Sequence, residues 1–300
     1  KGGLDIKYGI NDAFTLDAIL IPDFGQTKYD DQILNLGPFE QEFNENRPFF
    51  TEGTDLFSKG NLVYSRRIGG NPTYNPADNE AIIDGPANVN LINALKVSGR
   101  TKDGLGIGIL NAVTEKTFGT ILNNDTQETR RAVLEPLANY NVLVLDQRFR
   151  KNSSVTFVNT NVTRNGDFRD ANVSALVWDL NTQKNTYNLS GDFKYSYVND
   201  LEDKKGIATT LNFSETSGKY RYSFGGDLYI GTPINYPFLL GKRNGLSVDL
   251  LKQGSLEPIW QDGIKNEYKY DLYTASFLLR YDFSIRSFIR AGGGIQHERF

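Results

Sequence analysis

The chain has 300 residues, a formal net charge of −3 and no basic excess, so its size suits one large domain and its charge disfavours nucleic-acid binding. It has no cysteine and a single histidine, which excludes Cys–His catalysis, histidine-cluster zinc sites and haem ligation. The mean hydropathy of −0.44 and the lack of a long apolar run exclude a helical membrane span, but not a membrane β-barrel, whose strands only alternate in polarity.

The chain also lacks methionine, so we expect it to be part of a longer protein. Residues 1–300 are expected to form one domain. Neither a cofactor nor a metal site is expected.

Residues 4–21 predict a β-hairpin. Leu4, Ile6, Tyr8 and Ile10 alternate with polar residues and glycine, and Pro22 ends the strand ladder because it has no N–H to donate. An irregular stretch follows over residues 22–60, in which phenylalanines are interleaved with acids. Residues 61–67 are predicted to return to the sheet as a strand, and residues 69–90 read as a loop.

The rest of the chain predicts long strands joined by polar turns. Hairpins are expected over 91–113, 141–163, 172–197 and 207–229, and further strands near 245–252, 266–279 and 281–291. Residues 114–140 read as a loop. In the stretch 104–110, Gly104, Gly106 and Gly108 share one strand face, which leaves room for another backbone or a bulky partner.

These strands indicate an all-β fold, an antiparallel transmembrane β-barrel of roughly 12–16 strands that closes on itself. An irregular segment, about residues 30–60, is expected in or over the lumen. The alternation is cleanest over 187–197, where Asp192 and Lys194 are expected to face the lumen and four residues to face lipid: Tyr187, Leu189, Phe193 and Tyr195. A soluble β-sandwich has the same alternation and remains the alternative fold.

Several motifs are similar to those of a Bacteroidota outer-membrane family: IPDFGQ (21–26), FNENRPFFTEGTDLF (43–57), YSRRIGG (64–70), SGRTKDGLGIGILNAVTE (98–115), EPLANYNVLVLDQ (135–147), NTNVTR (159–164) and RDANVSALVWDLN (169–181). In that family a β-barrel of unknown function follows a module similar to family 9 carbohydrate-binding domains. The resemblance implies that this chain is the barrel portion, located in the bacterial outer membrane. It implies no settled activity.

The irregular segment supplies the candidate site residues. We expect residues 38–60 to narrow the barrel mouth or lumen, with acids of the segment paired to Arg66, Arg67 and Arg100. The expected constriction consists of Phe39, Phe43, Glu45, Arg47, Phe49, Phe50, Glu52, Asp55, Phe57, Arg66 and Arg67. A loop packed on the rim is the alternative placement.

No catalytic residue is assigned. A glycosidase could use a pair of carboxylates among Glu45, Glu52 and Asp55, but such a pair is defined by a separation that sequence does not give. Backbone hydrogen bonds and arginine pairing are the favoured roles for these acids. The single histidine, His297, is expected to be a surface residue.

The favoured function is a non-enzymatic outer-membrane protein, either a channel or a subunit of a larger envelope assembly. A carbohydrate-binding or carbohydrate-active hydrolase anchored by the barrel is the first alternative, and a soluble β binding domain is the second. The expected partners are outer-membrane lipid, other envelope proteins, and glycans bound through a preceding module. No nucleic acid is expected.

Overall fold

A computed structural model describes residues 3–22, 44–199, 203–217, 220–231, 245–249, 271–284 and 287–299. Most of these residues lie in antiparallel strands, and the α-helix α1 (Pro48–Thr51) has only four residues. The predicted all-β antiparallel class is therefore confirmed. No helix in the described part of the chain is long and apolar enough to cross a membrane.

The described residues contain sixteen strands, which agrees with the expected number. Their bounds are β1 (Leu4–Asn11), β2 (Phe14–Leu20), β3 (Glu80–Asp84), β4 (Leu91–Arg100), β5 (Leu105–Thr114), β6 (Thr117–Asn123), β7 (Thr129–Glu135), β8 (Ala138–Phe149), β9 (Ser153–Arg164), β10 (Asp170–Asn181), β11 (Tyr187–Asn199), β12 (Lys204–Glu215), β13 (Tyr220–Gly231), β14 (Gly245–Asp249), β15 (Asp271–Ser284) and β16 (Ser287–Arg299).

Thirteen strands are hydrogen-bonded in the order β1-β2-β4-β5-β8-β9-β10-β11-β12-β13-β16-β15-β14, and β3-β6-β7 form a separate sheet. Most neighbours are consecutive in sequence, which is the connectivity that a chain of hairpins produces. Among the described strands, β1 and β14 are the two ends of the order. Closure into a barrel stays a prediction.

The chain divides into two compact units whose boundary runs through β8 to β11. Unit 1 consists of Lys1–Asp146, Phe157–Ser174 and Tyr197–Lys204, and unit 2 of Gln147–Thr156, Ala175–Ser196 and Lys205–Phe300. The two units are described separately below.

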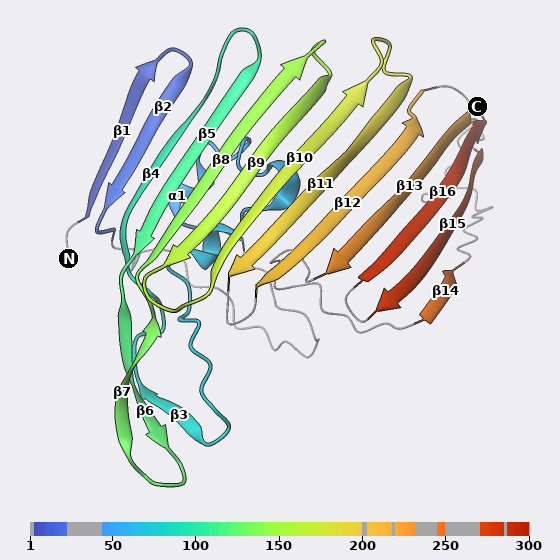
Figure 1. The fold of residues 1–300 in the computed structure, drawn as a ribbon. Coiled ribbons are helices and arrows are strands. Elements are labelled where there is room, and N and C mark those ends of the chain that lie inside the picture. Colours follow the sequence, from blue (N-terminus) through green and yellow to red (C-terminus); the bar gives the residue numbers. More distant parts are fainter. Residues whose placement is uncertain are drawn as a thin grey trace, which may run out of the picture. The chain divides into compact units, whose positions relative to one another are not determined.

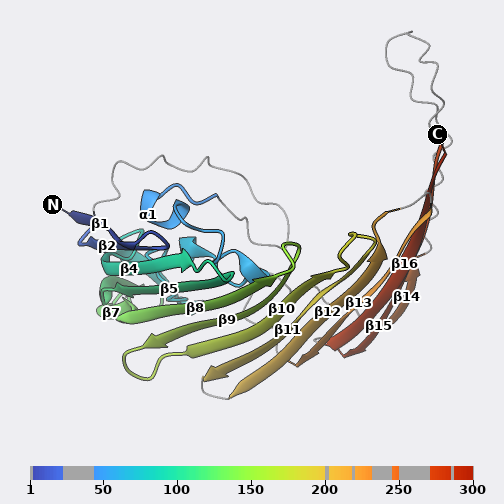
Figure 2. The same ribbon diagram turned by 90° about the horizontal axis from the view of Figure 1, so that it is seen from above.

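In unit 1, β4 pairs with β5 so that Lys96 is opposite Leu110 and Ser98 is opposite Gly108. Residues on this face of the two strands are largely buried, because α1 and the turns that follow it pack there (Figures 1 and 2). We call this the inner face and the opposite one the outer face. Residues 44–68, which contain α1, are called the inner segment.

Two loop predictions in unit 1 are wrong. Residues 114–140 and 69–90 contain β6, β7 and β3, which form the three-stranded sheet. We call this sheet the arm, because it extends β5 and β8 beyond the ends of the neighbouring strands (Figure 1). Tyr74 packs on its small core, which consists of Ile121, Ala132 and Leu134.

The predicted strand over 61–67 is also wrong. The chain there forms two short 3₁₀ turns, η1 (Lys59–Asn61) and η2 (Ser65–Arg67). Gly60 and Asn61 both have positive φ angles, 69° and 52°, which are incompatible with an extended strand.

In unit 2, β12, β13, β16, β15 and β14 pair in that order. Phe213 is opposite Phe224 across β12 and β13, and Phe224 is opposite Gly293 across β13 and β16. The sequence predicted a strand break near residue 280, but β15 continues from Asp271 to Ser284. His297 lies on β16 between Tyr220 and Tyr273 of the neighbouring strands.

Candidate functional site

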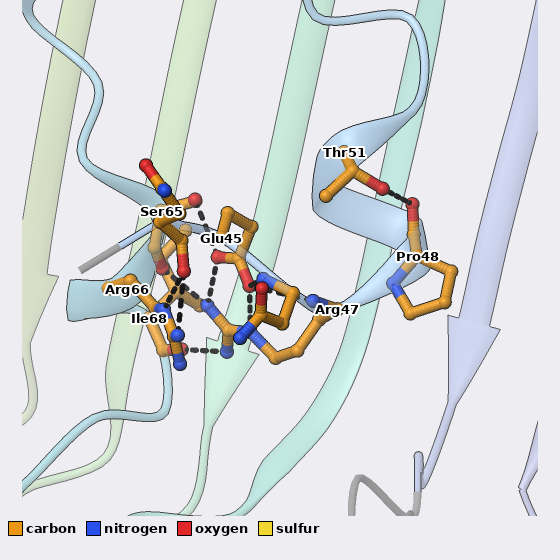
Figure 3. A network of polar contacts seen from close by, with 9 residues as sticks. Glu45, Arg47, Pro48, Thr51, Ser65, Arg66 and Ile68 are labelled. Atoms are coloured by element: carbon orange, nitrogen blue, oxygen red, sulfur yellow. Dashed lines mark hydrogen bonds and ion pairs between the residues drawn. The ribbon is translucent and has the colours of Figure 1, made fainter. Parts of the chain in front are cut away.

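The inner segment is closed by a clasp of polar contacts around Arg47 (Figure 3). The Arg47 guanidinium donates to both Glu45 carboxylate oxygens, at 2.9 and 2.7 Å, and to the backbone carbonyls of Ser65 (2.7 Å) and Ile68 (2.5 Å). Ser65 Oγ donates to Glu45 at 2.6 Å, and Arg66 donates to the Asn44 carbonyl. These bonds join the beginning and the end of the segment into one loop.

The Glu45 carboxylate is fixed in its charged form. Burial alone would raise its pKa, but the hydrogen bonds from Arg47 and Ser65 and the Arg47 charge outweigh burial and hold the pKa at about 2. Bidentate pairing of this kind gives a strong and directional contact. Glu45 is therefore a structural anion and is poorly suited to act as a general acid.

The side chains of two adjacent aromatic residues of α1 are buried next to the clasp. Phe49 and Phe50 are 6% and 5% exposed and meet edge to face, with ring centroids 5.0 Å apart. The Arg47 guanidinium lies 4.3 Å from the Phe50 ring centroid. Phe50 thus packs against the same arginine that closes the clasp, and Phe49 packs against Phe50.

A buried lysine on the sheet binds the backbone of the inner segment. Lys96, on β4, is 1% exposed and donates to the carbonyls of Phe49 and Glu52, each at 2.6 Å. It also lies 3.3 Å from an Asp17 carboxylate oxygen on β2, and 4.8 Å from the Phe49 ring. The end of α1 is therefore attached to the inner face through an ammonium group with oxygen partners.

The glycines of β5 let the segment approach the sheet. A Cβ placed on Gly106 would lie 2.8 Å from Leu56, and one on Gly108 would lie 3.2 Å from the Phe57 ring and 3.3 Å from Leu56. Leu56 and Phe57 are themselves 7% and 5% exposed. The expectation that this glycine face leaves room for a bulky partner is confirmed for Gly106 and Gly108, whereas Gly104 lies in the turn before β5 with a φ of 88°.

A cavity of about 300 Å³ remains between the segment and β4–β5. Aromatic and aliphatic side chains line it together with hydroxyl groups, among them Phe50, Phe57, Tyr64, Ser58 and Thr54. This volume is at the low end for a small-molecule site. The charged groups at its wall, Glu45 and Lys96, already have partners within the protein.

The structure places the remaining predicted constriction residues as follows. Glu52 pairs with Lys7 of β1, Asp55 is exposed and its carbonyl accepts from Ser58, and the Arg67 guanidinium lies 5.9 Å from the Tyr64 ring centroid. Phe39 and Phe43 lie outside the described residues. Arg100 pairs with Asp146 of β8 instead of with an acid of the segment.

Three residues that sequence reasoning missed complete the site: Lys96, Ser65 and Asp146. Lys96 had a usable signal, since it is a lone cation between Ala94 and Ser98 on one face of a predicted strand. Asp146 likewise continues the face of Val142 and Val144, both buried. Ser65 had no signal, because its role depends on the fold of the inner segment.

The described residues contain no group of three or more Asp, Glu, His or Cys side chains arranged to hold a metal ion. The four residues predicted to face lipid lie in unit 2 and are all exposed: Tyr187 39%, Leu189 37%, Phe193 44% and Tyr195 38%. On the other face of the same strand, Lys194 and Asp192 are paired at 3.1 Å and are each 16% exposed. Contact with lipid stays a prediction.

We predict that Gly108→Val loosens the inner segment. The added methyl groups would overlap Phe57 and Leu56, and overpacking of this kind costs about 1–3 kcal/mol. Trypsin cleavage of the inner segment after Lys59 or Arg66 should become faster in the variant. Ile109→Val on the outer face is the matched control, and equal cleavage of both variants would contradict the packing.

We predict a pH dependence that comes from Glu45. Its pKa is lowered from 4.5 to about 2, so its contribution to stability is complete above pH 4.5 and is lost as the pH falls through about 2. Because solvent screens the partly exposed carboxylate, the contribution is well below the roughly 3 kcal/mol that the full shift would give. In urea unfolding, Glu45→Gln should be destabilised at pH 7 and should show a flatter pH dependence between 4.5 and 2. A parallel pH dependence in the variant and the parent would disprove the assignment.

Comparison with known proteins identifies the family but gives no activity. No curated protein matches the chain. Two solved structures of OmpT, an outer membrane protein of Vibrio cholerae, are similar to this chain. The first is a mutant that lacks loop L8; it is 12% identical, and the match covers 99% of this chain and 89% of that chain. The second is OmpT folded in vitro in its trimer form; it is also 12% identical, and the match covers 99% of this chain and 90% of that chain. Both have a TM-score of 0.35, and at that level neither bears on the fold or function of this chain.

A family model matches residues 1–230, well over half of the chain. The match extends past the region in which the sequence motifs are dense and ends within β13. The chain belongs to the family described as domain of unknown function DUF5916.

Proposed function

We propose that this protein is an outer-membrane β-barrel whose lumen is narrowed by the inner segment, and that it acts as a constricted, non-enzymatic channel or as the channel-like subunit of an envelope assembly. The observation that carries the proposal is the opposite character of the two sheet faces. One face exposes large apolar side chains, and the other carries charged groups and an irregular segment of chain.

Unit 1 shows this division clearly. Leu95, Ile109, Leu145 and Phe157 are 38–42% exposed on the outer faces of β4, β5, β8 and β9. Contiguous exposed apolar surface of this kind is unusual in a soluble monomer and is what lipid contact requires. On the inner face, Lys96 and the Arg100–Asp146 pair are polar, as in a lumen.

The inner segment also suits a lumen better than lipid. Its backbone is irregular, and hydrocarbon offers no partners for unpaired carbonyls. The Lys96 ammonium donates hydrogen bonds to the carbonyls of Phe49 and Glu52. The Arg47 guanidinium donates to those of Ser65 and Ile68. An irregular segment is tolerated at membrane depth only where protein groups satisfy it in this way.

Unit 2 supports the same proposal independently. Tyr187 begins β11, and its ring stacks on Phe213 of β12 at 5.9 Å; Phe213 in turn lies 6.2 Å from Tyr222 of β13. These aromatic residues gather where the strands meet their turns. Membrane barrels carry aromatic girdles at this level, where the rings meet the lipid headgroups.

The acids of the segment support a non-enzymatic role. Glu45 is fully engaged with Arg47 and Ser65, and Glu52 with Lys7. Of the three carboxylates considered for glycoside cleavage, these two already neutralise a cation within the protein. A carbohydrate-active hydrolase and a soluble binding domain are the alternatives, and release of the protein from membranes at high pH and high salt would favour the soluble domain.

Location in the bacterial outer membrane, contact with lipid and association with other envelope proteins are parts of this proposal. So are the Bacteroidota origin and the preceding carbohydrate-binding module that the sequence resemblance implies, through which glycans would be bound. No nucleic-acid partner and no cofactor is proposed.

We predict that Leu189→Arg and Ser190→Arg differ strongly in their cost. Leu189 is 37% exposed on the proposed lipid face, where arginine near the bilayer midplane costs about 2–4 kcal/mol. Ser190 is on the opposite face, so arginine there should cost much less. Reversible unfolding from lipid vesicles measures the loss of unfolding free energy in each variant. Equal losses would contradict the assignment of the two faces.

We predict that deleting residues 45–58 raises single-channel conductance in planar bilayers, because the deletion removes α1 and the acids and aromatic residues that fill the lumen. The parent should resist extraction from membranes at high pH and high salt. The control is Gly108→Val, which retains the segment but loosens it and should give an unsteady conductance. A folded deletion variant with the conductance of the parent would place the segment outside the pore.

A further inference from the structure

We infer that the base of the arm is an anchor for anionic phospholipid headgroups, formed by Lys116, Phe118 and Arg131. The inference rests on the proposed membrane location and adds a lipid-binding surface to it. Four observations support it: the position of the arm, the difference between the two faces of its sheet, the partners of its cations, and the exposed apolar side chains at its base.

The position of the arm places its base at the level of the headgroups. β5 has ten residues, which is the length of a tilted strand that crosses the hydrocarbon core. Lys116 lies two residues beyond the last residue of β5, and Phe118 follows in β6. The arm continues past this point, beyond the ends of the neighbouring strands (Figure 1).

The arm has one covered face and one open face. Tyr74 covers the face of Ile121, Ala132 and Leu134. Cross-strand pairing puts Phe118 opposite Val133 and Thr120 opposite Arg131, so these four residues share the other face. Phe118 is 39% exposed there, and no segment within the described residues packs over it.

Within the described residues, Arg131 of the open face and Lys116, which precedes β6, have aromatic contacts but no acid partner. The Arg131 guanidinium lies 4.5 Å from the Phe118 ring centroid, and the Lys116 ammonium lies 5.3 Å from it. Neither side chain forms an ion pair within the described residues. Arg130 on the covered face differs, since it binds Glu80 at 2.8 Å and the Tyr74 hydroxyl at 2.8 Å.

Exposed apolar side chains continue from the arm to the neighbouring loop. Leu137, between β7 and β8, is 38% exposed, and its carbonyl accepts from the Asn165 backbone at 2.9 Å. The loop between β9 and β10, which contains Asn165, also carries Phe168, which is 42% exposed. Two cations that have no acid partner within the described residues, in contact with the exposed Phe118, match an anionic headgroup with acyl chains below it.

The experiment compares phosphatidylglycerol with phosphatidylcholine at this surface. Leu137→Trp, in a Trp178→Phe and Trp260→Phe background, reports lipid contact at the arm base by quenching with brominated lipids in vesicles. The relative affinity for phosphatidylglycerol is measured for the reporter protein, for Lys116→Gln with Arg131→Gln, and for Arg130→Gln as the matched control on the covered face.

We expect the double variant to lose preference for phosphatidylglycerol, by about fivefold for each cation removed. Arg130→Gln should keep the preference, and quenching by brominated phosphatidylcholine should be equal in all proteins, which shows that the reporter still lies at the interface. An unchanged preference in the double variant, or an equal loss in Arg130→Gln, would overturn the inference alone. A protein that fails to float with vesicles would overturn both the inference and the proposed function.

Discussion

The buried ammonium of Lys96 is the constraint on which the rest of unit 1 depends. A charge that is 1% exposed is costly unless oxygen atoms surround it, and β4 alone cannot supply them. The carbonyls of Phe49 and Glu52 do so, together with Asp17 of β2. The lysine therefore needs the inner segment, and the end of α1 needs the lysine, because neither set of polar groups is satisfied without the other.

This mutual dependence explains why β5 has glycines and not larger residues on its inner face. The lysine holds α1 close to β4, so the residues that follow α1 must lie against β5. Leu56 and Phe57 occupy the space that side chains at Gly106 and Gly108 would fill. Glycine weakens a strand, but here that cost is offset by the burial of two large apolar side chains. The Glu45–Arg47–Ser65 clasp then closes the loop.

Sequence periodicity predicted the long hairpins because each strand there faces two different environments along its whole length. β11 shows this well: Tyr187 to Tyr195 alternate with Asn188 to Lys194 without interruption. The arm was missed for the opposite reason. Its strands have five to seven residues, and bulges between Ile82 and Asp84 and between Thr117 and Phe118 break the alternation. The inner segment was recognised as a unit from its composition, but its fold was not, since Arg47 and Lys96 bind backbone carbonyls that every sequence possesses.

The presence or absence of a carboxylate partner distinguishes cations with a structural role from cations that can bind a ligand. Arg47, Lys96 and Arg100 lie on or against the inner face, and each is neutralised by a carboxylate of the protein: Glu45, Asp17 and Asp146. Arg164 similarly lies 3.5 Å from Glu135, a buried acid that also accepts a hydrogen bond from Thr73 and so joins the loop before β3 to the end of β7.

A cation that already has a carboxylate partner within the protein gains little binding energy from a second anion, because the cost of desolvating the pair is already offset. Among the described residues, Lys116 and Arg131 have the Phe118 ring beside them and no acid partner, so an external anion would be attracted by both charges. This contrast points to the arm, and not to the charged inner face, as the place where the protein attracts a negatively charged partner.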